Sequence, residues 1–126
     1  MTIVLDTWAL LALLKDEPAA ARVEEAWLAE TAVMCSLNLG EALYMQIRAH
    51  GEKAARRTIE KVRAELEVVD PDWPLVADAA AIRSAGGLSF ADCFAIATAR
   101  RYNAPLWTGD PEIIGATRSS EIVDLR

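Results

Sequence analysis

The sequence has 126 residues, a mass of 13.7 kDa and a formal net charge of −6 at pH 7. This length predicts one domain over 1–126, because it suffices for one ordinary hydrophobic core and leaves little room for a second. The acidic balance argues against a basic protein that coats duplex nucleic acid, although a local basic surface remains compatible with it.

The longest apolar run extends from Trp8 to Leu14 and is far shorter than the roughly 20 residues that span a bilayer. No basic segment precedes it, as one does in a secretory signal, so cytoplasmic residence is the expectation. One histidine, His50, and two cysteines exclude a Cys/His zinc set, a Ser-His-Asp triad and a histidine pair for metal-independent RNA cleavage. We expect Cys35 and Cys93 to be buried as small hydrophobic residues.

Short β-type runs alternate with helical patterns from the first residues onward. A strand is predicted over 2–5, followed at once by a helix over 8–15. Pro18 suits the first turn of a helix that reaches Glu30, and a buried strand follows over 32–35. Helical spacing then covers 39–49, breaks near Gly51 and resumes over 53–66.

The second half of the chain continues this alternation. A third strand over 66–69 stops at Asp70 and Pro71, a helix covers 73–85, and Ser89 opens a helix that ends near Tyr102. A strand over 106–108, a short helix after Pro111 and a weak strand over 122–123 complete the pattern. The alternation predicts an α/β fold with a parallel sheet flanked by helices on both faces, whose ligands collect at the carboxyl ends of the strands.

Four acidic residues stand at the entrances of the predicted helices: Asp6, Glu41, Asp92 and Asp110. All four can face the carboxyl end of the sheet. Carboxylates within about 4 Å of each other repel by roughly 4 kcal/mol at an effective dielectric constant of 20. A divalent cation would relieve this repulsion, and Mg²⁺ or Mn²⁺ is the appropriate type because both prefer oxygen ligands.

Helix capping is the competing interpretation of the same four residues. Asp6 and Asp110 are natural N-cap residues, and the segments 38–41 and 89–92 both resemble capping boxes. Capping does not require all four acids to lie at one end of a sheet, and a residue can cap a helix and bind a metal. Both interpretations therefore stay open at this point.

The segments 4–7, 36–41, 88–92 and 106–110 resemble the four acidic motifs of PIN-domain ribonucleases, especially the VapC toxins of toxin–antitoxin pairs. The resemblance covers essentially the whole chain and implies a five-stranded parallel sheet in the order 3-2-1-4-5. It also implies endonucleolytic RNA cleavage with Mg²⁺ or Mn²⁺, a homodimer, and a separately encoded antitoxin that covers a groove of the toxin.

Position by position, the resemblance assigns the metal and the attacking water to Asp6, Glu41, Asp92 and Asp110. Ser36 and Thr108 become supporting polar groups. Asn38 stands where the family commonly has Thr or Ser, and Ile113 stands where it often has an aromatic residue. Glu112 is a further acid, more consistent with a solvent-facing side chain than with a metal contact.

Basic residues gather in the segment 48–63, where six basic side chains face two acidic ones. Lys53, Arg57 and Lys61 recur every four residues and so share one helical stripe, with Arg48 just before it. This segment is either the RNA-binding rim of the acidic site or a solvated helix face with paired charges.

Two other classes of protein compete with the ribonuclease. A phosphoacceptor receiver domain has a similar length and would use Asp70 after the third strand. It requires paired acids after the first strand and a lysine after the fifth, whereas here Asp6 stands alone and Asp124 follows Val123. A catalytically silent binding module with the same fold would retain the acids only as helix caps.

Overall fold

The structure is a computed structural model and describes residues 1–116 and 121–126. Its strands form one parallel sheet in the order β3-β2-β1-β4-β5. The strands are β1 (Thr2–Leu5), β2 (Thr31–Cys35), β3 (Glu67–Val69), β4 (Leu106–Thr108) and β5 (Ile122–Asp124). This confirms the order 3-2-1-4-5 and excludes the receiver alternative, because receiver domains have the order 2-1-3-4-5.

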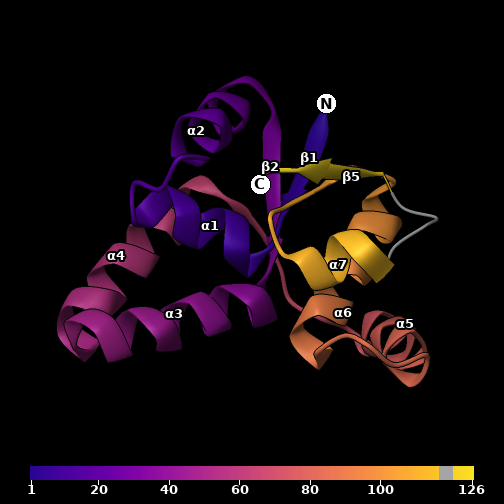
Figure 1. The fold of residues 1–126 in the computed structure, drawn as a ribbon. Coiled ribbons are helices and arrows are strands. Elements are labelled where there is room, and N and C mark those ends of the chain that lie inside the picture. The colour runs from indigo at the N-terminus through magenta and orange to yellow at the C-terminus, as the bar shows by residue number, and fades with distance from the viewer. Residues whose placement is uncertain (117–120) are drawn as a thin grey trace.

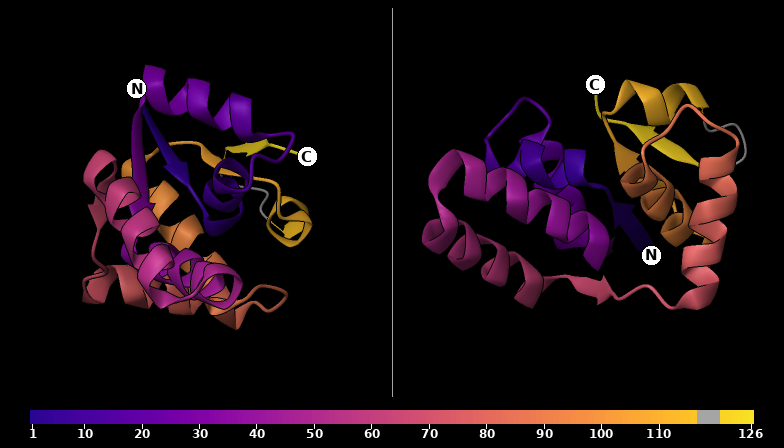
Figure 2. Two further views of the ribbon diagram at one scale, coloured as in Figure 1. Left: turned by 90° about the vertical axis from the view of Figure 1, so that its left-hand side faces the viewer. Right: turned by 90° about the horizontal axis from the view of Figure 1, so that it is seen from below.

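Helices cover both faces of the sheet (Figure 1). They are α1 (Thr7–Leu14), α2 (Ala20–Ala29), α3 (Ser36–His50), α4 (Glu52–Glu65), α5 (Trp73–Ser84), α6 (Phe90–Tyr102) and α7 (Pro111–Ala116). Figure 2, seen from below, separates the group α1–α4 from the group α5–α7. None of these helices in the described ranges is long and apolar enough to cross a membrane.

The central strand β1 explains why the two helical groups pack where they do. Ile3 and Leu5 belong to the apolar cluster under α1–α4, whereas Val4 belongs to the cluster under α5–α7. Successive side chains of a strand point to opposite faces, so a strand covered on both faces needs an uninterrupted apolar run. Cys35 and Cys93 are free and buried in the second cluster, as predicted.

Two predicted helix starts were wrong. Helix α3 begins at Ser36 rather than near 39, because the chain turns directly from β2 into the helix with Cys35 as N-cap. The segment 38–41 therefore lies inside the first turns of α3 and is not a capping box. Helix α2 begins at Ala20, and Pro18 lies in the turn before it, where the Ala20 amide donates to the carbonyl of Glu17.

Candidate active site

The predicted site lies where the three central strands end. Asp6 directly follows β1, and Asp110 follows β4 with one residue, Gly109, in between. Helix α3, which carries Glu41, starts directly after β2. Asp92 comes from the first turn of α6, which packs against β1, β2 and α3. Ligands of parallel α/β proteins bind at this edge, close to the point where the strand order reverses.

Asp6 is the most buried of the four acids, with 3 % of its surface exposed. Its Oδ1 accepts a hydrogen bond from the amide of Ala9 at 2.8 Å and caps α1, while its Oδ2 accepts one from the hydroxyl of Thr108. The pKa of Asp6 is raised to about 7, chiefly by burial and to a smaller extent by the charges of Asp110 and Asp92, against the lowering effect of both hydrogen bonds. Asp6 is thus a carboxyl group that exchanges its proton near neutral pH.

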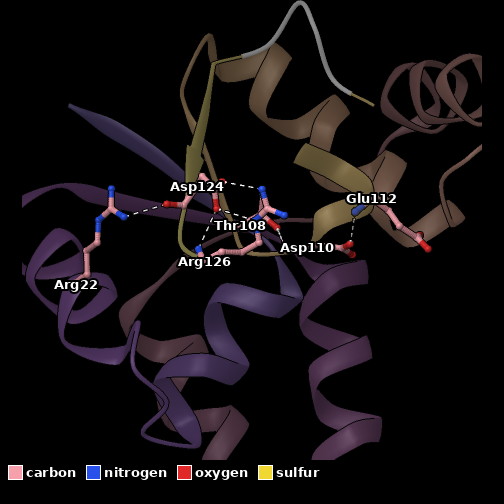
Figure 3. A network of polar contacts seen from close by, with 6 residues as sticks. All are labelled: Arg22, Thr108, Asp110, Glu112, Asp124 and Arg126. Atoms are coloured by element: carbon pink, nitrogen blue, oxygen red, sulfur yellow. Dashed lines mark hydrogen bonds and ion pairs between the residues drawn. The ribbon is translucent and has the colours of Figure 1, made fainter. Parts of the chain in front are cut away.

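Thr108 joins two of the acids. Its fully buried hydroxyl donates to Asp6 and accepts the amide of Asp110 at 3.0 Å. The Asp110 carboxylate then accepts the amide of Glu112 at 2.9 Å within the first turn of α7, as Figure 3 shows. Asp110 therefore caps α7, as predicted, and the same loop connects it through Thr108 to Asp6.

Asp92 forms the predicted capping box with Ser89. The amide of Asp92 donates to the Ser89 hydroxyl at 3.1 Å, and the amide of Ser89 donates back to the Asp92 carboxylate at 3.3 Å. Partial burial raises the pKa of Asp92, and the charges of Asp110 and Glu41 raise it as well, against the lowering effect of Ser89. Asp92 is therefore within electrostatic reach of two other acids of the set.

Glu41 differs from the other three acids because it caps nothing. It lies on α3, is partly buried, and makes no side-chain hydrogen bond to the described part of the chain. Its charge nevertheless contributes to the raised pKa of Asp92. The four acids are thus linked in one electrostatic neighbourhood, to which each comes from a different element.

The donor chemistry of this neighbourhood fits a hard divalent cation. Its members are carboxylates, whose oxygens are the ligands that such ions prefer. Each oxygen of Asp6 accepts one hydrogen bond and has a second lone pair with which it can bind a cation. Within residues 1–116 and 121–126, however, no three His, Cys, Asp or Glu side chains are gathered closely enough to hold one ion. Convergence on one ion therefore requires side-chain rotation, for which Glu41 is the freest of the four.

Comparisons with known proteins agree with this fold. Residues 3–117 match the family model of the PIN domain. The chain belongs to the PIN-domain family. No curated protein sequence matches it.

Solved structures with the same fold include VapBC complexes and a VapC toxin. DNA-bound VapBC from Salmonella typhimurium aligns with a TM-score of 0.80 and 15% identity, covering 100% of this chain and 99% of that one. VapBC2 from Rickettsia felis, bound to a promoter DNA fragment, gives 0.79 and 16% over 98% of both chains. VapC20 from Mycobacterium tuberculosis, described as a sarcin-ricin loop cleaving toxin, gives 0.73 and 20% over 90% of this chain and 94% of that one.

Two other carboxylates near the acids of this PIN domain do not join them. Glu112 is exposed, and Figure 3 shows its carboxylate directed away from that of Asp110. Asp124 pairs in register with Thr108 on β5, but its carboxylate binds the guanidinium of Arg126 at 3.0 Å. Hydrogen bonds from the Arg126 side chain lower the pKa of Asp124, which stays ionised.

The predicted supporting and RNA-binding residues are more scattered. Ser36 is the first residue of α3 and makes no side-chain hydrogen bond to any described residue. Arg48 is exposed and lies seven residues after Glu41 on α3, hence on the same helical face. Helix α4 begins only after the whole of α3, about 22 Å long at 1.5 Å per residue.

On α4 itself the basic residues are exposed, and some are paired within the helix. Arg56 pairs with Glu52, and Arg63 pairs with Glu60. Lys61 of the predicted stripe lines a hollow against the carboxyl-terminal ends of α1 and α2. The stripe formed by Lys53, Arg57 and Lys61 thus stays a prediction, and none of the four acids lines the hollow that Lys61 lines.

Two features of the site were missed by sequence reasoning. Gly109, between Thr108 and Asp110, is buried, and a Cβ atom there would clash with the indole ring of Trp8. Only glycine therefore fits at this position. The second feature is Asn38, which is 2 % exposed and hydrogen-bonded across two helices; its spacing to Glu41 instead suggested a capping box.

Proposed function

We propose that this PIN domain is an Mg²⁺- or Mn²⁺-dependent endoribonuclease and the toxin of a toxin–antitoxin pair that resides in the cytoplasm and blocks translation or growth. One observation carries the proposal: four carboxylates from separate elements share one electrostatic neighbourhood at the carboxyl edge of the sheet. The likeness of the fold to an RNA-cleaving toxin, VapC20, supports it.

Phosphodiester hydrolysis requires an activated water, an in-line approach and neutralisation of the charge that develops on phosphate. A bound divalent ion supplies the neutralisation and lowers the pKa of the water. In this proposal Asp6, Glu41, Asp92 and Asp110 would hold the ion and orient the water. Thr108 fixes Asp6 and the loop of Asp110 with its two hydrogen bonds. Asp6 would bind the ion as its deprotonated carboxylate, and its pKa of about 7 makes that form available near neutral pH.

The test is cleavage of a total RNA pool by the purified protein with Mg²⁺, with Mn²⁺ and with excess chelator, followed by mapping of the new ends. We expect internal cuts with either ion and none with chelator. Asp110→Asn is the informative variant and Glu112→Gln is its matched control, because the two acids lie two residues apart at the start of α7 and only Asp110 belongs to the coupled set. Cleavage that persists in chelator would refute the mechanism, and no cleavage under any condition would favour the silent binding module.

The antitoxin partner is part of the proposal. A hollow of about 690 Å³ lies between α1, α2 and α4, with Leu13, Trp27 and Val62 in its lining. At its rim Leu28 is 82 % exposed, although it is a large apolar side chain. We propose that an apolar segment of the antitoxin covers this hollow. Leu28→Glu is expected to weaken assembly with the antitoxin and to leave RNA cleavage unchanged, which co-purification and a cleavage assay measure.

A homodimer is proposed through an exposed apolar face of α3. Leu37 and Tyr44 are exposed at 38 % and 49 % and lie seven residues apart on one helical face. Phe90, exposed at 45 %, starts α6 next to the point where α6 contacts α3. Light scattering after gel filtration tests the proposal, since Tyr44→Glu should convert a dimer into a monomer. A parent protein that is monomeric at all concentrations would contradict it.

A further inference from the structure

Asn38 is a buried polar residue whose presence is not explained by a contribution to folding stability. It is 2 % exposed in the first turns of α3, and its Oδ1 has no hydrogen-bond partner in the part of the chain that the structure describes. A leucine of similar shape would leave no polar atom to satisfy. Unpaired polar atoms of this kind are uncommon in folded proteins and call for an explanation.

The remaining polar atoms of Asn38 connect three helices. Its Nδ2 donates to the carbonyl of Ala91 on α6 at 2.9 Å, and its backbone carbonyl accepts the hydroxyl of Thr7 on α1 at 3.1 Å. Thr7 is also buried, at 7 % exposed. The carbonyl of Ala91 lies inside α6, where the helix already provides it with an amide partner. The hydrogen bond from the Asn38 amide is therefore not needed to satisfy the Ala91 carbonyl. Its effect is to hold α3 and α6 in a fixed relative position.

Each end of this connection lies beside an acid of the proposed site. Thr7 follows Asp6, Ala91 precedes Asp92, and Glu41 is three residues after Asn38 on the same side of α3. The connection spans 31 residues of sequence on one side and 53 on the other. Asp6, Glu41 and Asp92 belong to three different parts of the chain, and this connection between α1, α3 and α6 consequently sets the distances between them.

We propose that Asn38 is a positioning residue that fixes α1, α3 and α6 relative to one another, so that the side chains of Asp6, Glu41 and Asp92 can rotate onto one divalent ion. This inference rests on the proposed metal-dependent function. Groups that orient metal ligands without touching the metal typically change metal affinity or activity by 10–100-fold when they are removed. The predicted consequence of losing the Asn38 amide is thus weaker metal binding in a protein that still folds.

The decisive experiment measures Mn²⁺ affinity by isothermal titration calorimetry on the full chain without RNA, alongside thermal melting and the Mn²⁺ concentration for half-maximal RNA cleavage. Asn38→Leu removes the donor and keeps the shape. We expect its Kd for Mn²⁺ to rise by about 10-fold or more, with the half-maximal concentration rising in parallel and the melting temperature maintained. Gln46→Leu is the matched control, because Gln46 is an equally buried amide two turns further along α3, at 5 % exposed; its Kd should match that of the parent.

Two more variants keep the proposal testable if Asn38→Leu folds poorly. Thr7→Val removes the hydroxyl that binds the Asn38 carbonyl and should weaken Mn²⁺ binding less than Asn38→Leu does. Asn38→Thr restores a donor and should recover part of the affinity. A parental Kd in both Asn38→Leu and Thr7→Val, or an equal loss in Gln46→Leu, would overturn the role of Asn38.

The outcome separates this inference from the proposed function. If the parent cleaves RNA with Mn²⁺ and Asn38→Leu binds Mn²⁺ as the parent does, the function stands and the positioning role falls. If the Mn²⁺ affinities follow the expected order and the parent cleaves no RNA, the positioning role stands and the ribonuclease proposal falls.

Discussion

Charged groups at the carboxyl edge of the sheet are held differently from those on α4. At the edge, Asp6 is almost fully buried, both of its oxygens are hydrogen-bonded, and its pKa is raised to about 7. On α4, Arg56 and Glu52 form an ion pair with 62 % and 64 % of their side-chain surfaces exposed. Ion pairs exposed to this extent contribute roughly 0–1 kcal/mol to stability.

The comparison shows that the carboxylates at the edge of the sheet are better suited to bind a cation or a proton than the charged groups on α4 are to bind a ligand. Burial and neighbouring acids raise the pKa values of Asp6 and Asp92, so binding of a cation or a proton there relieves an unfavourable negative charge. The α4 charges are already solvated or paired, so a ligand gains less from each of them. Four predictions exploit this contrast, from the largest expected effect to the smallest.

Removing one carboxylate from the edge should have the largest effect. Asp6→Asn, Glu41→Gln, Asp92→Asn and Asp110→Asn should each lower kcat for RNA cleavage by about 10² or more, the scale typical of losing one transition-state-stabilising group. Their effects should not add in combination, because the acids act as one unit. Steady-state kinetics on a mapped substrate provide the measurement, with Glu112→Gln at the parental rate. Near-normal rates in three of the four variants would remove the site.

Metal should stabilise the parent more than a variant that keeps the cap. Asp110→Asn preserves an N-cap of similar strength and removes one charge. At 100 times its Kd, Mg²⁺ is expected to stabilise the parent by about 2.7 kcal/mol and the variant much less. Thermal melts in chelator and across a Mg²⁺ series measure the difference. Equal shifts in the two proteins would mean that Asp110 only caps α7.

The raised pKa of Asp6 gives the metal-free protein a specific pH dependence. The unfolded chain releases this proton near pH 3.8 and the folded protein only near pH 7. Between these values the folded state holds the extra proton, so the contribution of Asp6 to stability falls as the pH rises and is constant above about pH 7. Denaturant titrations from pH 4 to 8 in chelator should show this slope reduced in Asp6→Asn. An unchanged slope would show that Asp6 titrates normally.

The smallest effect is expected on α4. Replacing Lys53, Arg57 and Lys61 together by alanine should weaken binding to unrelated RNAs and flatten its salt dependence, by about 0.7 in slope for each phosphate that the protein no longer neutralises. Filter binding at several salt concentrations, with an active-site variant to prevent cleavage, measures both quantities. Arg48→Ala should cost more per charge, because Arg48 shares its helical face with Glu41. Parental affinity and slope in the triple variant would identify the stripe as a solvated face.

Local signals made most of the fold predictable. The alternation of apolar runs and helical spacing specified each strand and helix, and Ser89 with Asp92 specified a capping box that the structure contains. The start of α3 was mispredicted because Asn38 and Glu41 have the spacing of a capping box. The chain instead turns into α3 directly after β2. Cys35 is the N-cap residue, and no side chain caps this end of the helix.

The sequence by itself determined the positions of the four acids, because strand ends and helix entrances are local features that place them at one edge of a parallel sheet. Only the tertiary structure decided how they interact. Thr108 binds Asp6 across 102 residues, and Asn38 binds Ala91 across 53. Such contacts, together with the burial that raises the pKa of Asp6, depend on how helices pack on the sheet, which no local spacing of residues encodes.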